Sequence, residues 1–228
     1  MRTVTLLPSR KYTVGKVLCL AQNYAKHAKE MGGSPPLEPV IFLKPSTAII
    51  ENGAPIVLPK FSNDVHHEVE LTVLLGKGGR NIPRSEAYNC VAGYGIGLDM
   101  TMRDKQKEAK AAGNPWAIAK GFDTSAPLSP FLPKAQVPDP NDLDIRLNVN
   151  GVERQHANTS GMVYKVDFII SFLSSVFTLE EGDIIFTGTP EGVGKVVAGD
   201  IIDAEIRGVG RLHHEVIPDS SQFSGAAG

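Results

Sequence analysis

The stretch VHHEVELTVLLG, residues 65–76, has the pattern of a β-strand that is charged at its start and apolar at its end. A strand places residues two apart on the same side, so Glu68 and Glu70 point in one direction, together with His66 and Thr72. One side of the strand therefore belongs to a core, and the other side either lies in water or holds something with its paired carboxylates. The core side carries Val65, His67, Val69, Leu71 and Val73.

The composition is that of an ordinary globular protein. The chain has 228 residues, of which 42% are hydrophobic and 21% are charged, so it suits one large domain or a domain with a small extension. The formal net charge of −2 gives no reason to expect nucleic acid or an anionic membrane as a partner. No apolar run approaches the length that spans a bilayer. These numbers argue against the nucleic-acid-binding and membrane-spanning classes.

The start of the chain and its cysteines favour a cytoplasmic protein. Residues 1–12, MRTVTLLPSRKY, lack the long apolar core and the small-residue cleavage site of a secretory signal. Cys19 and Cys90 are the two cysteines, and they form no disulfide framework, which favours a reducing compartment. Each lies in an apolar, strand-like run, so we expect buried thiols in preference to a catalytic cysteine.

Short strands outnumber helices along the chain. Asn150–Gly151 lies between two alternating arms and is a favoured pair for a tight hairpin turn. A threonine start, good helix formers and a glycine stop predict a helix over 101–113. Apolar spacing predicts another helix over 162–177, and 23–31 has room for two helical turns. Further strands are expected over 16–22, 39–44, 54–59, 68–75, 182–188 and 200–217. The sum is a β-rich α+β domain.

A third carboxylate suggests a metal site. Asp99 ends a glycine-rich apolar strand and stands just before the helix that Thr101 opens. A lone aspartate in that place is often only a helix cap. If Asp99 converges with Glu68 and Glu70, however, the three form the ligand set that hard divalent ions such as Mg²⁺ and Mn²⁺ prefer. A zinc site would need more histidine or cysteine.

Polar side chains on the following helix lie close to Asp99 in sequence. Arg103 and Gln106 are three residues apart and hence neighbours on the helix surface. They overhang the metal if Asp99 binds one, and otherwise belong to a solvated face. Lys120 lies between an apolar stretch and a glycine, where a buried lysine would need a partner and an exposed lysine would need none. The solvated face of the helix is marked by Lys105, Lys107, Glu108 and Lys110.

A histidine and a glutamate form another candidate pair near the start of the chain. His27 and Glu30 are three apart on a short predicted helix, so the carboxylate can hydrogen-bond the imidazole. Such a partner fixes the tautomer of the ring and raises its basicity, as an enzyme that activates water requires. The same spacing also occurs on ordinary surface helices, and spacing alone does not separate the two interpretations.

Seven motifs together resemble the fumarylacetoacetate hydrolase family, in the compact form of acylpyruvases and oxaloacetate decarboxylases. The resemblance runs from about Lys16 to Ile217 and implies a mixed β-sandwich roll with a few short helices. It implies one catalytic domain over 1–217. The small, polar composition of the last residues predicts a loose tail over 218–228. The motifs are, in order, NYAKHAKEMG, PVIFLKPSTAI, HHEVELTVLLG, GYGIGLDMTMRDKQ, AKGFDTSAPLSP, LNVNGVERQ and GDIIFTGTPEGVG.

The resemblance also implies roles for individual residues. It implies that Mg²⁺ or Mn²⁺ is the cofactor and that His27 and Glu30 form a water-activating dyad on a lid. It places Lys120 among the catalytic residues, where it neutralises anionic groups of the substrate. The metal ligands that it implies are Glu68, Glu70 and Asp99. The substrate contacts are Tyr24, Lys44, Arg103, Gln106 and Thr189, and we expect the Thr189 hydroxyl to donate to the substrate.

The implied activity is cleavage of a C–C bond in a small 2-oxo acid. We expect hydrolysis of acylpyruvates such as fumarylpyruvate or acetylpyruvate, and decarboxylation of oxaloacetate through the same enolate. An isomerase, dehydratase or lyase of the same family stays open, and so does a metal-dependent binding protein without turnover. Gln22 departs from relatives that carry arginine or leucine there, so the identity of the substrate stays open too. The resemblance further implies a homodimer.

Overall fold

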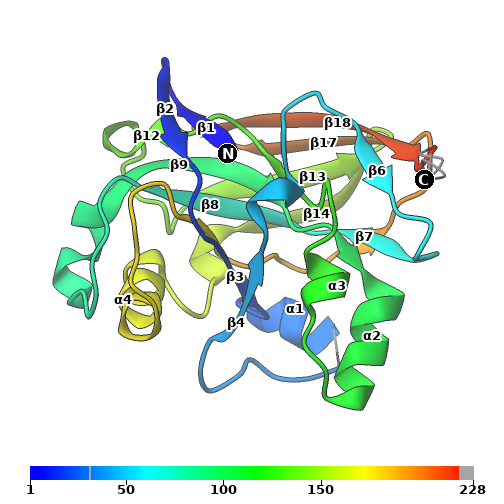
Figure 1. Cartoon of the computed structure of the whole chain (residues 1–228), viewed down its shortest axis with the longest axis horizontal. Helices are drawn as coiled ribbons and strands as arrows, with labels where there is room; N and C mark the ends of the chain where they lie inside the picture. The colour runs from blue at the N-terminus through cyan, green and yellow to red at the C-terminus, as the bar shows by residue number, and fades with distance from the viewer. Residues whose placement is uncertain (31, 221–228) are drawn as a thin grey trace, which may run out of the picture.

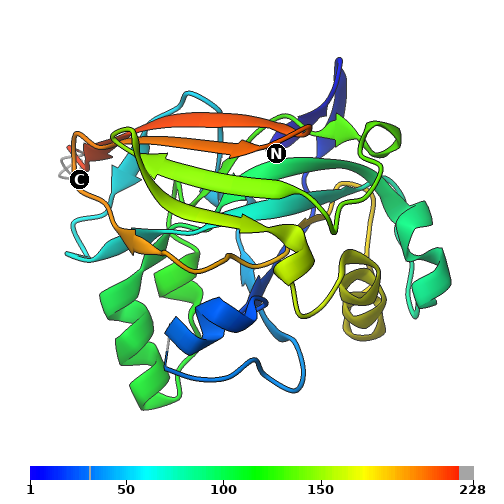
Figure 2. The same ribbon diagram turned by 180° about the vertical axis from the view of Figure 1, so that it is seen from behind.

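Two curled sheets pack face to face and form the body of the molecule (Figure 1 and Figure 2). The computed structural model describes residues 1–30 and 32–220. The larger sheet has eight strands in the order β4–β3–β15–β8–β9–β11–β5, with β12 paired to β9. Both sheets combine parallel and antiparallel pairs, so the predicted mixed β-sandwich roll is confirmed. The eight strands span, in sheet order and with β12 last, Val40–Lys44, Val17–Ala21, Ile184–Phe186, Val69–Leu75, Val91–Leu98, Ala126–Leu128, Ile49–Glu51 and Leu132–Pro133.

The second large sheet has five strands in the order β14–β13–β17–β18–β6. They span Val152–Asn158, Asp144–Val149, Ile201–Ile206, Gly210–Pro218 and Ile56–Leu58. Three short strands form a small sheet in the order β10–β7–β16, and they span Thr101–Met102, Val65–His67 and Gly194–Lys195. A hairpin of β1 and β2 spans Thr3–Leu6 and Arg10–Thr13.

Helices α1, α2 and α3 gather on one side of the sheets, as both ribbon views show. The four α-helices span Ala25–Glu30, Arg103–Ala112, Ala117–Lys120 and Val166–Val176. The 3₁₀ turns η1 to η4 span Ser46–Ala48, Arg84–Cys90, Lys134–Gln136 and Thr159–Gly161. Within the described ranges, none of the helices has the length and apolar character needed to cross a membrane.

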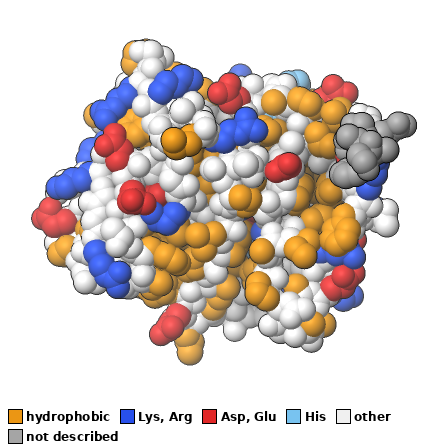
Figure 3. Space-filling view, viewed as in Figure 1, with side chains coloured by type: hydrophobic (Ala, Val, Ile, Leu, Met, Phe, Trp, Pro, Cys, Tyr) orange, Lys and Arg blue, Asp and Glu red, His pale blue; other side chains and the backbone are white. Residues whose placement is uncertain are grey.

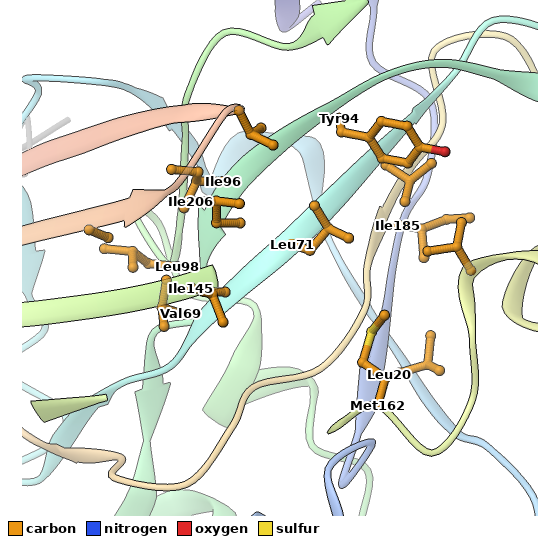
Figure 4. Close-up of a cluster of buried hydrophobic side chains, with 14 of the residues drawn as sticks. Leu20, Val69, Leu71, Tyr94, Ile96, Leu98, Ile145, Met162, Ile185 and Ile206 are labelled. Atoms are coloured by element: carbon orange, nitrogen blue, oxygen red, sulfur yellow. The ribbon is translucent and has the colours of Figure 1, made fainter. Parts of the chain in front are cut away.

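The main hydrophobic core fills the space between the two large sheets (Figure 4). Leu71 and Ile96 enter it from β8 and β9, and Ile145 and Ile206 enter it from β13 and β17; all four are fully buried. Burial of each such side chain contributes about 1.5–3 kcal/mol. Strands β13 and β17 alternate buried and partly exposed residues, because only one of their faces meets this core.

Strand β8 is buried along its whole length, because its second face is covered as well. A smaller cluster that includes Leu74, Ile184 and Phe186 lies on that second face, and the β1–β2 hairpin adds Val4 and Tyr12 to it. The carboxylate-bearing side of the 65–76 stretch is therefore not a solvated face. Of the two interpretations open at the sequence level, the structure excludes the one that places Glu68 and Glu70 in water, because they are 4% and 1% exposed.

The 65–76 stretch does not form one strand, and that expectation is wrong at Glu68. β7 ends at His67 and pairs with β10 and β16, whereas β8 begins at Val69 and pairs with β9 and β15. Glu68 lies between them, and its carbonyl accepts a hydrogen bond from the Asp99 amide (2.8 Å). The chain thus passes from one sheet to another at the residue that carries the first carboxylate.

Most of the other expected elements are confirmed. Asn150 and Gly151 join β13 to β14 with positive φ values of 53° and 77°, which a tight two-residue turn of this kind requires. Helix α2 ends at Gly113 in the left-handed conformation, as its glycine stop indicates. Helix α4 begins at Val166, four residues later than the apolar pattern predicts. Cys19 and Cys90 are buried free thiols. Only residues 218–220 of the expected tail belong to the described part of the chain.

Candidate active site

Three buried carboxylates meet at one edge of the eight-stranded sheet. β8 and β9 are antiparallel neighbours in which Glu70 is paired with Gly97, so the start of β8 lies beside the end of β9. Glu68 and Asp99, which flank these strand ends, therefore lie beside Glu70. One oxygen from each carboxylate lies within 4.8 Å of the other two. The convergence expected from the sequence is present.

Three cations contact two of these carboxylates. Lys120 Nζ, from α3, lies 2.8 Å from Glu68 Oε2 and 2.5 Å from Asp99 Oδ2. Lys44 Nζ, at the end of β4, lies 2.8 Å from Asp99 Oδ1, and it also donates to the carbonyl of Lys120. Arg103 Nη2 pairs with Glu68 Oε1. Lys120 is therefore a buried partner of the cluster and not an exposed lysine, because it is 2% exposed.

Glu70 differs from its two neighbours in its partners. Its Oε2 accepts the Gly188 amide at 2.6 Å, but no lysine or arginine of the described chain forms an ion pair with it. Burial, together with the charges of Asp99 and Glu68, raises the pKa of Glu70 well above its ordinary value. Burial also acts to raise the pKa of Glu68, but Lys120 and Arg103 outweigh burial and hold it well below its ordinary value.

The donor set of the cluster fits a hard divalent cation. Three carboxylates supply the oxygen ligands that Mg²⁺ and Mn²⁺ prefer. Glu70, buried beside Glu68 and Asp99 without a cation of its own, is the group that such an ion would compensate. His66 and His67 do not join the cluster, because His66 contacts Asp64 and the His67 ring faces Gln155. We therefore interpret the cluster as a candidate metal centre.

A small cavity adjoins the carboxylates, and helix α2 forms part of its wall. Its volume is about 20 Å³, which is room for about one water molecule. Arg103 Nη1 donates to Gln106 Oε1 at 2.6 Å, so the two residues form one polar unit. Lys110, seven residues after Arg103, lines the same cavity, although it is exposed like Lys107 and Glu108 of the solvated face that we expected; Lys105 is half-buried. The residues that line the cavity are Leu20, Ala21, Gln22, His27, Glu68, Glu70, Arg103, Gln106, Lys110, Trp116, Lys120 and Thr189.

Helix α1 brings His27 to this cavity. The ring is 5% exposed, and its Nδ1 lies 3.0 Å from Glu30 Oε2, as the spacing predicts. Because the carboxylate can only accept, Nδ1 carries the proton, and Nε2 of the neutral ring keeps its lone pair. The Gly192 amide donates to both oxygens of Glu30 (3.0 and 3.2 Å) and thereby holds the helix over the cavity. The pair has the geometry of a general base with its orienting group.

The Thr189 hydroxyl has a different role from the one expected. Gln155 Oε1 accepts the Val69 amide at 3.0 Å, so its Nε2 must be the donor toward Thr189 Oγ1 (2.8 Å). The Thr189 proton is then donated to the carbonyl of Val69 (2.9 Å). In this arrangement the hydroxyl offers the cavity an acceptor and not a donor. The buried Gln155 was not singled out in the sequence, because it lies on the mostly exposed arm of a hairpin.

Two expected substrate contacts lie outside the lining of the cavity. Lys44 lies beneath it, against Asp99 and Ser125. Tyr24 lines a separate surface pocket with Lys26, Gly161 and Glu191, and its buried hydroxyl has no hydrogen-bond partner among the described residues. A second residue that the sequence did not reveal is Asn23, which is fully buried and bonds the carbonyl of Thr187 and both backbone groups of Tyr164. It anchors the base of α1.

A glycine at position 188 allows the backbone there to approach Asn23 closely. Gly188 has φ of 96°, and a Cβ there would lie 2.7 Å from Asn23 Cβ. Its amide also donates to Glu70. A larger residue at this position would therefore disturb both the base of α1 and the carboxylate cluster.

Comparison with known proteins gives one consistent family. The family described as fumarylacetoacetate (FAA) hydrolase C-terminal matches residues 16–217. The oxaloacetate tautomerase FAHD1, mitochondrial, of Mus musculus is 49% identical over 91% of this chain and 95% of its own. The fumarylpyruvate hydrolase from Pseudomonas aeruginosa, solved in complex with Mn²⁺ and pyruvate, superposes with a TM-score of 0.92 at 39% identity, covering 96% of both chains. The 5-carboxymethyl-2-hydroxymuconate delta-isomerase from Mycobacterium smegmatis gives 0.83 at 40% identity, covering 95% of this chain and 83% of its own.

Proposed function

The chain belongs to the fumarylacetoacetate hydrolase family, and we propose that it is a divalent-metal-dependent enzyme that converts small 2-oxo acids through an enolate. The observation that carries this proposal is the buried triad of Glu68, Glu70 and Asp99, in which Glu70 has no cationic partner among the described residues. Mg²⁺ or Mn²⁺ held there would act as a Lewis acid toward the 2-oxo group.

The residues around the triad suit an anionic substrate. Arg103 and Lys120 present donors beside the carboxylates and can hold a carboxylate of the substrate by charge-assisted hydrogen bonds. Gln106 extends this polar wall. His27 Nε2, oriented through Glu30, can accept or return a proton. Together these groups bind, orient and protonate or deprotonate a 2-oxo acid.

The first reaction that we propose is keto–enol tautomerisation of oxaloacetate. It needs proton transfer between C3 and the oxygen of the 2-oxo group, and His27 is the histidine in the cavity lining, close enough to Glu68 for the two to interact electrostatically. The similarity to oxaloacetate tautomerases at 47–49% identity supports this choice. The same site would also stabilise the enolate that decarboxylation of oxaloacetate leaves behind.

The second candidate reaction is hydrolysis of the C–C bond of an acylpyruvate. The His27–Glu30 pair favours it, because a water molecule needs such a base to attack the distal carbonyl. The structural similarity to a fumarylpyruvate hydrolase supports it as well. An isomerase of an unsaturated 2-oxo acid is a further alternative, which the similarity to the muconate-type isomerase supports.

A substrate panel tests the proposal and ranks the reactions. Enol-oxaloacetate, oxaloacetate, acetylpyruvate, fumarylpyruvate and a hydroxymuconate-type acid are each followed by ultraviolet absorbance, with Mg²⁺ or Mn²⁺ and with a chelator. We expect turnover of at least one 2-oxo acid that the chelator abolishes and added metal restores. Turnover unaffected by the chelator, or no turnover of any member of the panel, would contradict the proposal.

We also infer a homodimer. β4 is an edge strand of the eight-stranded sheet, and Leu43 on it is 43% exposed. Hydrophobic side chains gather over the lower half of the face shown in Figure 3, the region of β3 and β4 in Figure 1. A second copy covering this surface would remove it from water. Light scattering should give twice the chain mass of 24.4 kDa, and a single-chain mass would contradict the dimer.

We propose that the protein is located in a reducing compartment such as the cytoplasm. Its support is that Cys19 and Cys90 are both buried free thiols. The Mus musculus relative is a mitochondrial protein by name. Fractionation of cells followed by immunoblotting separates the two locations.

A further inference from the structure

The helix that carries His27 lies on an excursion of the chain between β3 and β4, which are neighbours in the eight-stranded sheet. Helix α1 takes up the first half of the excursion, and residues 32–36 lead back toward β4. We name the described residues 24–30 and 32–36 the α1 segment. The place of His27 at the cavity depends on how the two ends of this segment are held.

The first end of the α1 segment is held by the backbone of Tyr164. Asn23 Oδ1 accepts the Tyr164 amide at 2.7 Å, and Asn23 Nδ2 donates to the Tyr164 carbonyl at 3.0 Å. The chains then continue side by side, because Tyr24 forms a β-bridge with Met162. Asn23 is fully buried, so water does not compete for these hydrogen bonds.

The second end of the segment is held by the side chain of the same residue. The Tyr164 hydroxyl donates to the carbonyl of Pro36 at 2.7 Å. Residues 34–39 have no regular secondary structure, and Leu37 among them is 99% exposed. Within the part of the chain that the structure describes, they form no other hydrogen bond to the rest of the protein. One hydroxyl therefore fixes the path by which the chain leaves α1.

The ring that carries this hydroxyl is placed by α4. Tyr164 stacks on Phe168 with 5.1 Å between ring centres, and Phe168 continues the row to Phe172 at 6.2 Å. Arg84 Cζ lies 5.8 Å from the centre of the Phe168 ring, and Arg84 also pairs with Asp167. The position of the hydroxyl is thus set by α4 and not by the segment that it holds.

Helix α1 needs such outside support to keep His27 in place. It has six residues, and a helix of that length is not stable in isolation. A general base acts only within hydrogen-bond reach of the proton that it takes, and a displacement of about 1 Å can cost a large part of the rate. Whatever fixes the ends of the α1 segment therefore also sets the position of the base.

We propose that Tyr164 is a positioning residue for His27, because its backbone and its hydroxyl hold the two ends of the α1 segment together. This inference rests on the proposed function, in which His27 transfers a proton at the cavity. Tyr164 does not line the cavity, so it acts through the α1 segment and not by contact with a substrate there. The hydroxyl is the part that can be removed alone, since phenylalanine keeps the ring stacked on Phe168.

Hydrogen exchange of Tyr164→Phe tests the hold on the segment without turnover. We expect the amides of α1 to exchange about 5-fold faster, which is the loss of about 1 kcal/mol at about 1.4 kcal/mol per factor of ten. Exchange within α4 should not change. Tyr88→Phe is the matched control, because the Tyr88 hydroxyl also has a hydrogen bond, from the Asn141 amide at 2.8 Å, outside the α1 segment.

A double-mutant cycle with His27→Ala tests the role in catalysis. The substrate is the member of the panel whose turnover falls most in His27→Ala. Tyr164→Phe should lower kcat about 5-fold and change KM less than about 2-fold, because the base is displaced while the carboxylate cluster is not. In the His27→Ala background the same substitution should lower kcat no further, since the group that it positions is gone.

The outcomes separate this inference from the function on which it rests. Unchanged exchange of α1 in Tyr164→Phe would overturn the hold on the segment. A fall in kcat that is equal in the wild-type and His27→Ala backgrounds would mean that Tyr164 has a structural role only. If the wild type turns over no 2-oxo acid of the panel, the proposed function is wrong and the catalytic role of Tyr164 is wrong with it, while the exchange of α1 still decides whether Tyr164 holds the segment.

Discussion

The floor of the cavity and the helix that covers it are built in opposite ways. The floor consists of Glu68, Glu70, Asp99, Lys44 and Lys120, which are at most 4% exposed and lie on strand ends and on α3. The cover is α1, a helix of six residues, which is too short to be stable in isolation. We therefore expect a substitution in α1 to leave the fold intact, whereas removal of a charge from the floor should lower the stability of the fold.

Contacts at the edge of the cover are correspondingly weaker. Glu30 meets the amide of Gly192, and Lys26 meets Glu191 at 3.4 Å, where Lys26 is 83% exposed. Exposed pairs of this kind contribute about 0–1 kcal/mol. The cavity of about 20 Å³ has room for about one water molecule, so we expect α1, with these exposed contacts at its edge, to move when a substrate enters.

The largest effect is expected from Asp99→Asn on the floor. Lys44 and Lys120 both pair with Asp99, so the change leaves two buried ammonium groups short of one negative charge. We expect loss of activity, weaker Mg²⁺ binding by calorimetry and a free energy of unfolding lower by about 3–5 kcal/mol, the cost of breaking a buried ion pair. The double variant Asp99→Asn/Lys44→Met should recover part of the stability but none of the activity. Normal metal affinity in Asp99→Asn would remove Asp99 from the metal centre.

A substitution in the cover, His27→Ala, should reduce activity without the loss of stability that is expected for Asp99→Asn. Loss of the base should reduce kcat/KM for acylpyruvate hydrolysis at least about 10²-fold while the melting temperature changes little. Decarboxylation of oxaloacetate needs no activated water and should fall less. Glu30→Gln should follow in the same direction, because it removes the acceptor that orients the ring. Equal slowing of both reactions would mean that His27 acts by closure or orientation, and no slowing would show that this buried histidine has no catalytic role.

Gln155 connects the floor to the loop that holds the cover, so Gln155→Glu sharpens the comparison. The amide donates to Thr189 Oγ1 and to the carbonyl of Pro190, and a carboxylate can do neither. We expect a loss of about 1–3 kcal/mol in stability from unsatisfied buried groups, together with a higher KM because the Thr189 hydroxyl is no longer fixed. The exposed neighbour Arg154, substituted by Gln, is the control. An unchanged KM in Gln155→Glu would show that the amide has only a structural role.

Acid should lower the free energy of unfolding through a histidine in the five-stranded sheet, which belongs to neither the floor nor the cover of the cavity. His214 on β18 is fully buried, its Nδ1 bonds the carbonyl of Ala54, and burial lowers its pKa. A histidine with a lowered folded-state pKa stabilises the fold above its ordinary value of about 6.5, and this stability is lost as the pH falls toward the lower folded-state pKa. Unfolding in urea should show a decline below pH 6.5 to which His214 contributes at most about 1.4 kcal/mol per pH unit, beside His66 and His67, whose pKa values burial also lowers. His214→Gln should make that decline less steep, and an identical slope would rule His214 out as a contributor.

The sequence by itself determined the features that depend on neighbours along the chain. The spacing of two predicted that Glu68 and Glu70 point the same way, and they do converge although the strand is interrupted at Glu68. Residues three apart in a helix paired His27 with Glu30. The Asn150–Gly151 turn and the glycine end of α2 followed from backbone preferences that are local as well. The family resemblance then supplied the roles of these residues, which no spacing could.

Only the tertiary structure decided what lies across from each of these residues. The carboxylate side of β8 is buried because residues distant in the chain cover it: the β1–β2 hairpin joins the cluster around Leu74, and Lys120 and Gly188 contact Glu68 and Glu70. Lys44 meets Asp99, and Lys110 contacts Trp116, which packs against Phe42, because β4, α2 and α3 come together around one edge of the sheet. The physical reason is that periodicity and caps are written in consecutive residues, whereas contacts between distant residues depend on the order and register in which the strands pair.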